Sequence, residues 1–256
     1  MVGDLSGFIA ATYKRGIPYI HIPTTLLAQV DSAIGGKTAI DLPSGKNLIG
    51  AFYQPKMVYS NISTLSHLPA RQIISGLAEV VKYGVISDNR LFCFLEKNTG
   101  KITKLSKEHL AHMVYTASKI KAKIVEADER ETLGLRTILN FGHTIGHALE
   151  TANSYKNLNH GEAISIGMVC AAEIAGEMGI FSPKDRSRLI SLLECLKLPT
   201  TAPKTDLNAV FRAFYRDKKF IHGRIRMVLP TCIGHVIVTE DVPLKLIEQI
   251  LQKRTK

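Results

Sequence analysis

The sequence predicts an α/β segment over residues 1–62, the remnant of a longer α/β domain, followed by a mainly α-helical domain over residues 63–256. Up to residue 62, a helical stretch alternates with short β-like runs and a Gly-rich passage. From Leu68 onward, apolar residues recur mostly at helical spacing. A length of 256 residues is consistent with one or two domains.

The first segment begins with a helix rather than a strand. GDLSGFIAATYKRG, residues 3–16, is helix-like and ends at Gly16, and strands are expected at YIHIP (residues 19–23) and MVYSNI (residues 57–62). A chain built of βα units places its first strand before its first helix. We therefore expect residues 1–62 to be the C-terminal remnant of an α/β domain that begins earlier.

Six segments of the second part have the length and apolar spacing of helices. They cover residues 70–86, 108–128, 135–152, 161–179, 184–196 and 243–254. RIRMVLP (residues 224–230) and HVIVTE (residues 235–240) are β-like and lie close enough in sequence to form one hairpin.

Composition narrows the class of partner. The formal net charge of +11 favours anions, but no aromatic residues interleave with the basic ones as on a nucleic-acid stacking platform. We therefore expect a small anionic substrate and no nucleic acid.

The most apolar stretch, residues 161–180, contains three glutamates, and the N-terminus lacks a signal peptide's basic and apolar regions. We therefore expect a cytoplasmic protein without a membrane span. Four cysteines without a CxxC pair predict reduced core residues.

The segment LRTILNFGHTIGHALE carries the most informative polar pattern. If it is one helix, Arg136, Asn140, His143 and His147 lie on a single stripe, because they are spaced i, i+4, i+7 and i+11. A guanidinium, an amide and two imidazoles on one face are typical of a site. The alternative, a solvated polar face, usually consists of Lys and Glu.

Several residues are candidate metal ligands. His143 and His147, at i and i+4, match the histidine pair of a zinc metalloprotease, but the general-base glutamate between them is absent, which excludes that class. His160 begins a nearly all-apolar helix and is either a ligand or a capping or surface residue. Glu79 and Lys82, one turn apart, form either an ion pair or a ligand and a substrate contact. Two histidines and a glutamate are a known catalytic zinc set.

Two Gly-Lys turns, Gly35-Gly36-Lys37 and Gly45-Lys46-Asn47, are candidate phosphate sites or ordinary surface turns. Gly36-Lys37-Thr38 resembles the end of a nucleotide-binding P-loop, but Asp31 stands where that motif needs its first glycine, so an NTPase is excluded. Further charged candidates, each equally consistent with a surface role, are Lys121, Glu131, Lys218 and Lys219.

Taken together, these segments resemble 3-dehydroquinate synthase, a sugar phosphate cyclase. The resemblance runs in order over nearly the whole chain and rests on GDLSGFIAATYKRG, IPTTLLAQVDSAIGGKTAIDLPSGKNLIGAFYQP, SGLAEVVKYG, ADERETLGLRTILNFGHTIGHALE, HGEAISIGM and RDKK. It implies a dehydroquinate synthase-like fold, NAD, one divalent metal (zinc or cobalt), and a homodimer. It also implies that residues 1–62 are the C-terminal remnant of an NAD-binding α/β domain. It also implies conversion of 3-deoxy-D-arabino-heptulosonate 7-phosphate to 3-dehydroquinate by oxidation, phosphate elimination, reduction and aldol closure.

The resemblance assigns roles by matching positions. The metal ligands are Glu79, His143 and His160, so His147 is not a ligand and instead contacts the substrate phosphate. The other phosphate contacts are Lys37, Asn47 and Arg15, which reaches across a dimer interface, and one of Lys218 and Lys219 matches a further substrate-contacting lysine. Lys121 and Arg136 match carboxylate contacts, and residues near the sugar hydroxyls are Asp31, Lys82, Glu131 and Asn140. Positions matching NAD contacts are Asp4, Thr24, Thr25, Lys37, Lys46, Thr64, Leu65, Ser66 and His67.

Two departures from the family pattern leave alternatives open. DERETLGLR is one residue longer than the family's usual spacing, which is expected to displace Glu131, and no GGG turn precedes GDL in this chain. One alternative is another sugar phosphate cyclase acting on a neutral sugar, although Lys121 and Arg136 favour an acidic substrate. The other is a folded, truncated remnant without catalysis.

Overall fold

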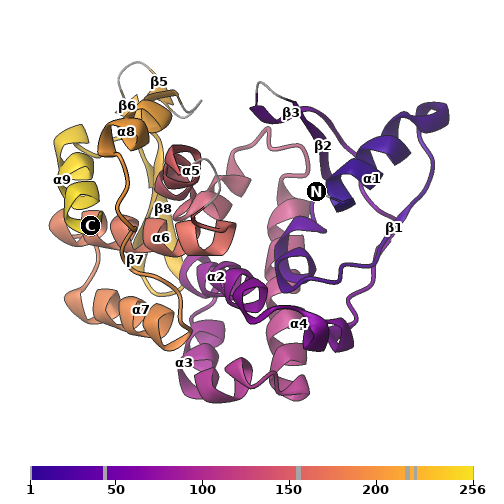
Figure 1. Cartoon of the computed structure of the whole chain (residues 1–256), viewed down its shortest axis with the longest axis horizontal. Coiled ribbons are helices and arrows are strands. Elements are labelled where there is room, and N and C mark those ends of the chain that lie inside the picture. The colour runs from indigo at the N-terminus through magenta and orange to yellow at the C-terminus, as the bar shows by residue number, and fades with distance from the viewer. Residues whose placement is uncertain (1, 43–44, 154–156, 217–219, 222–223, 256) are drawn as a thin grey trace.

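The computed structural model describes residues 2–42, 45–153, 157–216, 220–221 and 224–255. An α/β segment precedes a mainly helical part, as the sequence predicts (Figure 1). The elements of the N-terminal segment are α1 (Val2–Thr12), η1 (Tyr13–Arg15), β1 (Ile20–His21), η2 (Ala28–Ser32), β2 (Lys37–Leu42), β3 (Gly45–Phe52) and β4 (Met57–Val58). Strands β1 and β4 pair in parallel at the two positions where β-like runs were expected.

The Gly-rich passage forms structure that the sequence analysis did not assign. Strands β2 and β3 make an antiparallel hairpin, with Lys37 opposite Phe52 and a register shift between Ile40 and Leu42. The hairpin packs against α1. An added Cβ on Gly50 would lie 2.2 Å from the carbonyl oxygen of Thr38, so the passage needs glycine within a strand as well as in turns.

All six predicted helices are present in the second part, but one of them is interrupted. The helices are α2 (Ala70–Ile86), α3 (Asn89–Thr103), α4 (Lys107–Ala127), α5 (His143–Ala152), α6 (His160–Glu177), α7 (Pro183–Cys195), α8 (Leu207–Arg216) and α9 (Leu244–Arg254), with 3-10 turns η3 (Ile62–His67) and η4 (Leu135–Asn140). Helix α3 was not predicted, although Asp88 caps it by accepting hydrogen bonds from the backbone N–H groups of Arg90 and Leu91.

The predicted C-terminal hairpin is confirmed as β7 (Met227–Cys232) paired antiparallel with β8 (His235–Thr239). A short pair, β5 (Phe220–Ile221) and β6 (Arg224–Ile225), precedes it. In Figure 1 the indigo N-terminal segment lies on one side of α4, and the orange and yellow C-terminal elements lie beyond α6 on the other. No helix in the described part of the chain is long and apolar enough to cross a membrane.

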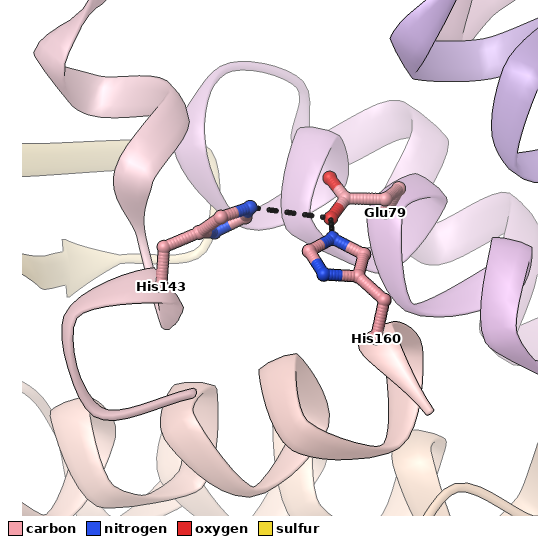
Figure 2. A group of neighbouring side chains, drawn as sticks. All are labelled: Glu79, His143 and His160. Carbon is pink, nitrogen blue, oxygen red and sulfur yellow. Dashed lines mark hydrogen bonds and ion pairs between the residues drawn. The ribbon is translucent and has the colours of Figure 1, made fainter. Parts of the chain in front are cut away.

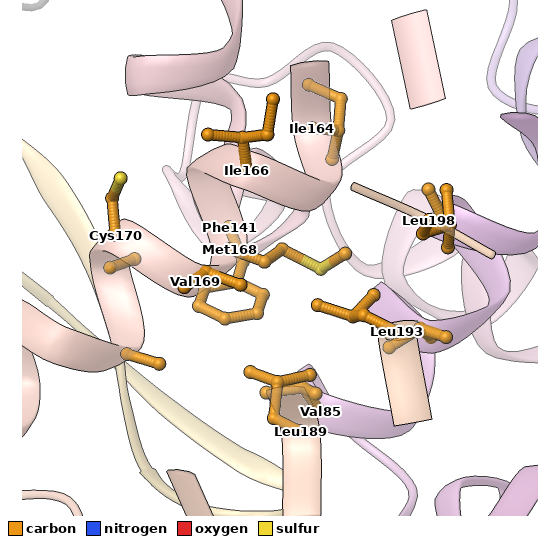
Figure 3. Close-up of a cluster of buried hydrophobic side chains, with 14 of the residues drawn as sticks. Val85, Phe141, Ile164, Ile166, Met168, Val169, Cys170, Leu189, Leu193 and Leu198 are labelled. Carbon is orange, nitrogen blue, oxygen red and sulfur yellow. The ribbon is translucent and has the colours of Figure 1, made fainter. Parts of the chain in front are cut away.

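Helix α6 forms the centre of the hydrophobic core. It is apolar on nearly every face, as a helix surrounded by other elements must be, and it packs against α2, α5, α7, α9 and β7. Figure 3 shows Ile164, Met168 and Val169 of this helix among side chains of α2 and α7. Cys170 is buried with them, whereas Cys195 and Cys232 are exposed, so the prediction of core cysteines is wrong for these two.

Two glycines allow α6 to approach its neighbours closely. A Cβ on Gly161 would lie 2.1 Å from the carbonyl oxygen of Ser75 in α2, and a Cβ on Gly167 would lie 2.0 Å from that of Gly142, just before α5. Both contacts are with backbone atoms, which cannot rotate away as a side chain can. The spacing of α2, α5 and α6 therefore depends on these positions.

Replacing Gly167 by alanine is expected to lower the free energy of unfolding by roughly 1–3 kcal/mol, the usual cost of overpacking. Gly100→Ala in α3 is the matched control, because an added Cβ there meets nothing within 4 Å. The control should raise stability by up to about 1 kcal/mol through helix propensity. Urea unfolding followed by circular dichroism measures both, and equal stability of the Gly167 variant and the unaltered protein would contradict the packing argument.

Candidate metal and substrate site

Three side chains that are far apart in sequence converge at one point. Glu79 comes from the middle of α2, and His143 and His160 are the first residues of α5 and α6. One ligand atom from each lies within 4.8 Å of the other two. Figure 2 shows both imidazoles directed at the carboxylate; His160 Nε2 is 3.1 Å and His143 Nε2 is 3.4 Å from Glu79 Oε1.

The local backbone places both histidines at helix starts. Gly142 has φ 78°, a left-handed conformation that separates η4 from α5. The prediction of one helix over residues 135–152 is therefore wrong. Arg136, Asn140, His143 and His147 do not lie on one face of a single helix, as the sequence spacing predicted. Asn159 begins α6 with a capping box, exchanging hydrogen bonds with Glu162, which fixes His160 on the first turn.

The ring orientation of His143 is fixed by a contact at Nδ1, the ring nitrogen that does not face Glu79. Its Nδ1 lies 3.1 Å from the carbonyl oxygen of Phe141. A carbonyl only accepts, so Nδ1–H donates, and in the neutral ring Nε2 then carries a lone pair facing Glu79. Burial lowers the pKa of His143 despite the attraction of Glu79, which favours this neutral form.

Glu79 is completely buried among cationic groups. Burial raises its pKa, but the Lys82 ammonium and the two imidazoles outweigh burial and hold the pKa well below its usual range. The two carboxylate oxygens have different partners: Lys82 forms an ion pair with Oε2, and both imidazoles face Oε1. Oε1 is therefore the oxygen that could share a cation with the two histidines.

His160 lies between two carboxylates. Burial lowers its pKa, but Glu150 and Glu79 outweigh burial and raise the pKa to about 10 in the metal-free protein. The ring therefore binds a proton where a cation would otherwise bind. Metal binding and protonation compete for this nitrogen, as is usual at histidine sites.

A second cluster adjoins the first through Lys82. Asp31 Oδ1 lies 3.7 Å from Lys82 Nζ and 2.8 Å from Lys121 Nζ, and it accepts a hydrogen bond from the hydroxyl of Tyr83. Burial would raise the pKa of Asp31, but Lys121 and Lys82 outweigh it and lower that pKa. Glu79, Lys82, Asp31 and Lys121 thus form a row of alternating charges, all of them largely buried.

Arg136 is buried beside the same region. Its Nη1 donates to the carbonyl oxygen of Glu129 at 2.8 Å, and its Nε has no partner within the described residues. A Cβ on Gly35 would lie 2.8 Å from Nη2, so the guanidinium requires a glycine there. Asp128 shapes the preceding loop by accepting hydrogen bonds from the backbone N–H groups of Leu133 and Arg136.

The predicted phosphate contacts are partly brought together. Asp4, Lys37 and Asn47 line one cavity of about 480 Å³ between α1 and the β2–β3 hairpin, and Lys37 Nζ lies 2.6 Å from Glu131 Oε2. The ring of His147 is 5.2 Å from that of His143 and lines a different hollow, between α5 and α8.

The predicted NAD contacts fall in two places. Asp4, Thr24 and Thr25 line a cavity of about 450 Å³ beside α1 and β1. Residues 64–67 form most of η3, where Thr64 accepts a hydrogen bond from Gln29, and they do not line that cavity. Lys46 lies in β3, and its side chain is outside the described part of the structure.

Four other predicted positions remain apart from these groups or lie outside the described residues. Arg15 is exposed in η1 with φ 66°, and Asn140 ends η4 beside Gly142 and Thr144. Lys218 and Lys219 lie outside the described residues.

Sequence reasoning missed three residues that shape the site. Tyr83 donates to Asp31, Glu150 faces His160, and Asp128 holds the loop of Arg136. Glu150 carried a weak signal, because it follows His143 by seven residues and therefore lies on the same face of a helix. Tyr83 carried none, since its partner is 52 residues away.

Comparison with known proteins identifies relatives along the chain. The family model described as 3-dehydroquinate synthase N-terminal matches residues 1–75, and the one described as 3-dehydroquinate synthase C-terminal matches residues 76–220. A 3-dehydroquinate synthase of Desulforamulus reducens is 49% identical over 94% of the chain, which spans 67% of that relative. One of Thermodesulfovibrio yellowstonii is 48% identical over 99% of the chain, which spans 70% of it.

Solved structures of related cyclases share the fold. The 2-epi-5-epi-valiolone synthase of Streptomyces hygroscopicus subsp. jinggangensis, with NAD+ and Zn2+ bound, gives a TM-score of 0.89 at 28% identity, over 98% of this chain and 69% of that one. A 2-deoxy-scyllo-inosose synthase complexed with carbaglucose-6-phosphate, NAD+ and Co2+ gives 0.90 at 31% identity, over 98% and 71%. With both family models matched in order and nearly half its residues identical to the curated relatives, this chain belongs to the 3-dehydroquinate synthase family.

Proposed function

We propose that this chain catalyses the 3-dehydroquinate synthase reaction, which converts 3-deoxy-D-arabino-heptulosonate 7-phosphate to 3-dehydroquinate and phosphate. The observation that carries the proposal is the convergence of Glu79, His143 and His160 beside a buried row of lysine and aspartate. The family to which the chain belongs supports the reaction.

The residues present fit one divalent cation. A carboxylate and two imidazoles are the donor set of many catalytic zinc sites, and cobalt accepts the same ligands. Both imidazole Nε2 atoms lie within 3.4 Å of the buried Oε1 of Glu79, an arrangement that a cation between the three ligand atoms could occupy with small adjustments. Glu79, His143 and His160 would hold the ion.

We infer that NAD binds beside α1, with Asp4, Thr24, Thr25, Lys37, Lys46 and residues 64–67 contributing. The cavity lined by Asp4, Thr24 and Thr25 supports this assignment. When bound, NAD supplies hydride removal and return, and the metal supplies Lewis acidity for the transient carbonyl.

The protein's own side chains would hold a triply charged substrate. We assign the substrate carboxylate to Lys121 and Arg136, and its phosphate to Lys37, Asn47 and His147. Lys121 is held by Asp31 and Lys37 by Glu131 in the structure, so binding would exchange these pairs for contacts with the substrate. Lys82, Asp31, Glu131 and Asn140 would then orient the sugar hydroxyls, and the fixed cations would stabilise the departing phosphate.

The charge of the site supports an anionic ligand. Glu79 and Asp31 balance Lys82 and Lys121, so the buried row is close to neutral by itself. A divalent cation and the Arg136 guanidinium add positive charge that the row cannot cancel. A phosphate and a carboxylate on one substrate provide the missing negative charge.

The second candidate is a cyclase acting on a neutral sugar phosphate, because the solved structures reported above include cyclases of that kind. Buried Arg136 favours the acidic substrate, since a neutral sugar would leave its guanidinium without an anionic partner among the described residues, where its shortest hydrogen bond is to the carbonyl oxygen of Glu129. A non-catalytic role is the third candidate, since the chain spans 67% to 70% of its curated relatives.

We also infer a homodimer in which Arg15 reaches the phosphate site of the partner subunit. We infer a cytoplasmic location and a domain boundary near residue 62 as well. Exposure of Arg15 at the end of η1 is consistent with such a reach. The two family models meet between residues 75 and 76. One of Lys218 and Lys219 would add a further contact with the substrate.

The purified chain, supplied with NAD and Zn2+ or Co2+, is expected to release phosphate from the heptulosonate faster than from glucose 6-phosphate or a ketoheptose 7-phosphate without a carboxylate. Arg136→Leu should lower kcat/KM for the acidic substrate about ten- to a hundredfold, the worth of a charge-assisted hydrogen bond. Arg130→Leu, an exposed arginine in the same loop, is the control.

Each alternative has its own outcome in this assay. Preference for a neutral sugar phosphate would assign the chain to the second candidate. No detectable NAD binding by calorimetry, with no phosphate release, would support the non-catalytic role.

A further inference from the structure

We propose that Glu150 is a positioning residue of the metal site, holding the imidazole of His160 by its outer nitrogen so that Nε2 faces the cation. This inference rests on the proposed metal site and assigns a fourth residue to it. Glu150 lies on α5, seven residues after His143.

The imidazole of His160 is held from both sides. Its Nε2 lies 3.1 Å from Glu79 Oε1, and its Nδ1 lies 3.5 Å from Glu150 Oε1. In Figure 2 the second ring nitrogen of His160 lies away from its contact with Glu79. The ring therefore connects the candidate metal position to a second carboxylate behind it.

Glu150 is a buried carboxylate, and its burial requires a compensating partner. Its exposed fraction is 8%, and within the described part of the chain its ion pair is with His160. A buried carboxylate costs several kcal/mol unless a partner compensates for lost hydration. At this position the partner is a metal-ligand imidazole, so the carboxylate and the ring depend on each other.

The two histidine ligands share one arrangement. Nδ1 of His143 is held by the carbonyl oxygen of Phe141, and Nδ1 of His160 is held by Glu150. Each contact fixes the tautomer and the ring angle and leaves Nε2 for the metal, as outer partners of metal-binding histidines usually do. The carboxylate also makes its imidazole a stronger donor than a carbonyl does.

A competing interpretation makes Glu150 itself a ligand. His147, Glu150 and His160 also place one ligand atom each within 4.8 Å of one another. His147 is exposed, however, whereas Glu79 and His143 are buried, and the Nε2 atoms of His143 and His160 face the same oxygen of Glu79. The cation therefore belongs with Glu79, and Glu150 stands behind His160.

Metal affinity of the full chain, measured by competition with a chromogenic chelator for Zn2+, tests the proposal. Glu150→Gln is expected to bind Zn2+ about ten- to a hundredfold more weakly, the usual effect of removing an outer partner. The visible spectrum of the Co2+-loaded variant should shift while remaining that of a bound ion. Glu177→Gln, which removes an exposed carboxylate at the far end of α6, is the charge-matched control.

A second pair of variants shows whether Glu150 acts through His160. In a His160→Ala background, Glu150→Gln should change the remaining affinity by less than about twofold, because the ring on which it acts is gone. Thermal unfolding of the metal-free variants checks folding. If Glu150→Gln does not fold, Glu150→Asp, which keeps the charge and withdraws it from the ring, should weaken Zn2+ binding in its place.

Three results would overturn the proposal. Unchanged Zn2+ affinity in the folded Glu150 variant would remove its role while leaving the metal site in place. Strong binding by His143→Ala, with none by Glu150→Gln, would move the cation to the group of His147. Failure of the unaltered chain to bind Zn2+ would reject the metal site and this inference together.

Discussion

Substituting glutamine for Glu79 is expected to reduce Zn2+ affinity by at least about a hundredfold. This loss exceeds the usual effect of removing a residue that contacts a metal ligand but not the metal. Phosphate release should fall to background. Glutamine keeps the size of the side chain but removes its negative charge, the one anionic ligand between two imidazoles. The reason is electrostatic, because a buried cation with neutral ligands alone would be poorly compensated. Metal content after dialysis and calorimetric titration measure the effect.

Glu126→Gln is the control for this substitution, since it removes an exposed carboxylate from α4. It should retain one Zn2+ per chain and normal activity. Equal metal content in the Glu79 variant and the control would reject Glu79 as a ligand. A similar loss in His143→Ala and His160→Ala would agree with three residues holding one ion.

Lys82→Met is expected to lower the free energy of unfolding of the metal-free protein by about 3–5 kcal/mol, the typical cost of breaking a buried ion pair. Lys82 is 1% exposed and lies between the carboxylates of Glu79 and Asp31. Methionine fills similar space but removes the cation that the two carboxylates share, so that among the described residues Glu79 keeps only the imidazoles and Asp31 only Lys121 as charged partners. Urea unfolding monitored by circular dichroism gives the free energy, with exposed Lys123→Met on α4 as the control.

Two further measurements separate charge from packing in this variant. Adding Glu79→Gln to Lys82→Met should restore part of the lost stability, because one of the uncompensated anions is removed. Zn2+ should stabilise Lys82→Met more than the unaltered protein, since the cation replaces the missing ammonium beside Glu79. If the double variant is less stable than Lys82→Met, packing rather than charge explains the loss.

Local patterns in the sequence were sufficient for most helices and for the C-terminal hairpin. The apolar spacing of residues 70–86 and the alternation in residues 235–240 depend on neighbouring residues, so single segments reveal them. The pattern failed at residues 135–152, where Gly142 adopts a left-handed conformation. Nothing local requires that conformation. An added Cβ on Gly142 would lie 2.7 Å from Met168 Cγ and 2.9 Å from the carbonyl oxygen of Ile164 in α6, so the packing of α6 leaves room there only for glycine.

The same distinction applies to the candidate site. The resemblance to the family's motifs identified Glu79, His143 and His160 as candidate ligands, but a motif does not give the distances between them. The contact between His160 and Glu79 joins residues 81 positions apart, and the one between Lys121 and Asp31 joins residues 90 apart. Such contacts exist only after α2, α4, α5 and α6 have packed.

By itself, then, the sequence determined the positions of most helices, the α/β beginning and the candidate metal ligands, because these follow from periodicity and motif. Tertiary structure alone decided that Tyr83 donates a hydrogen bond to Asp31, that Glu150 lies beside Nδ1 of His160, and that α5 begins at His143. The physical reason is that these features arise where different elements of the chain pack against one another, and such packing has no local signal.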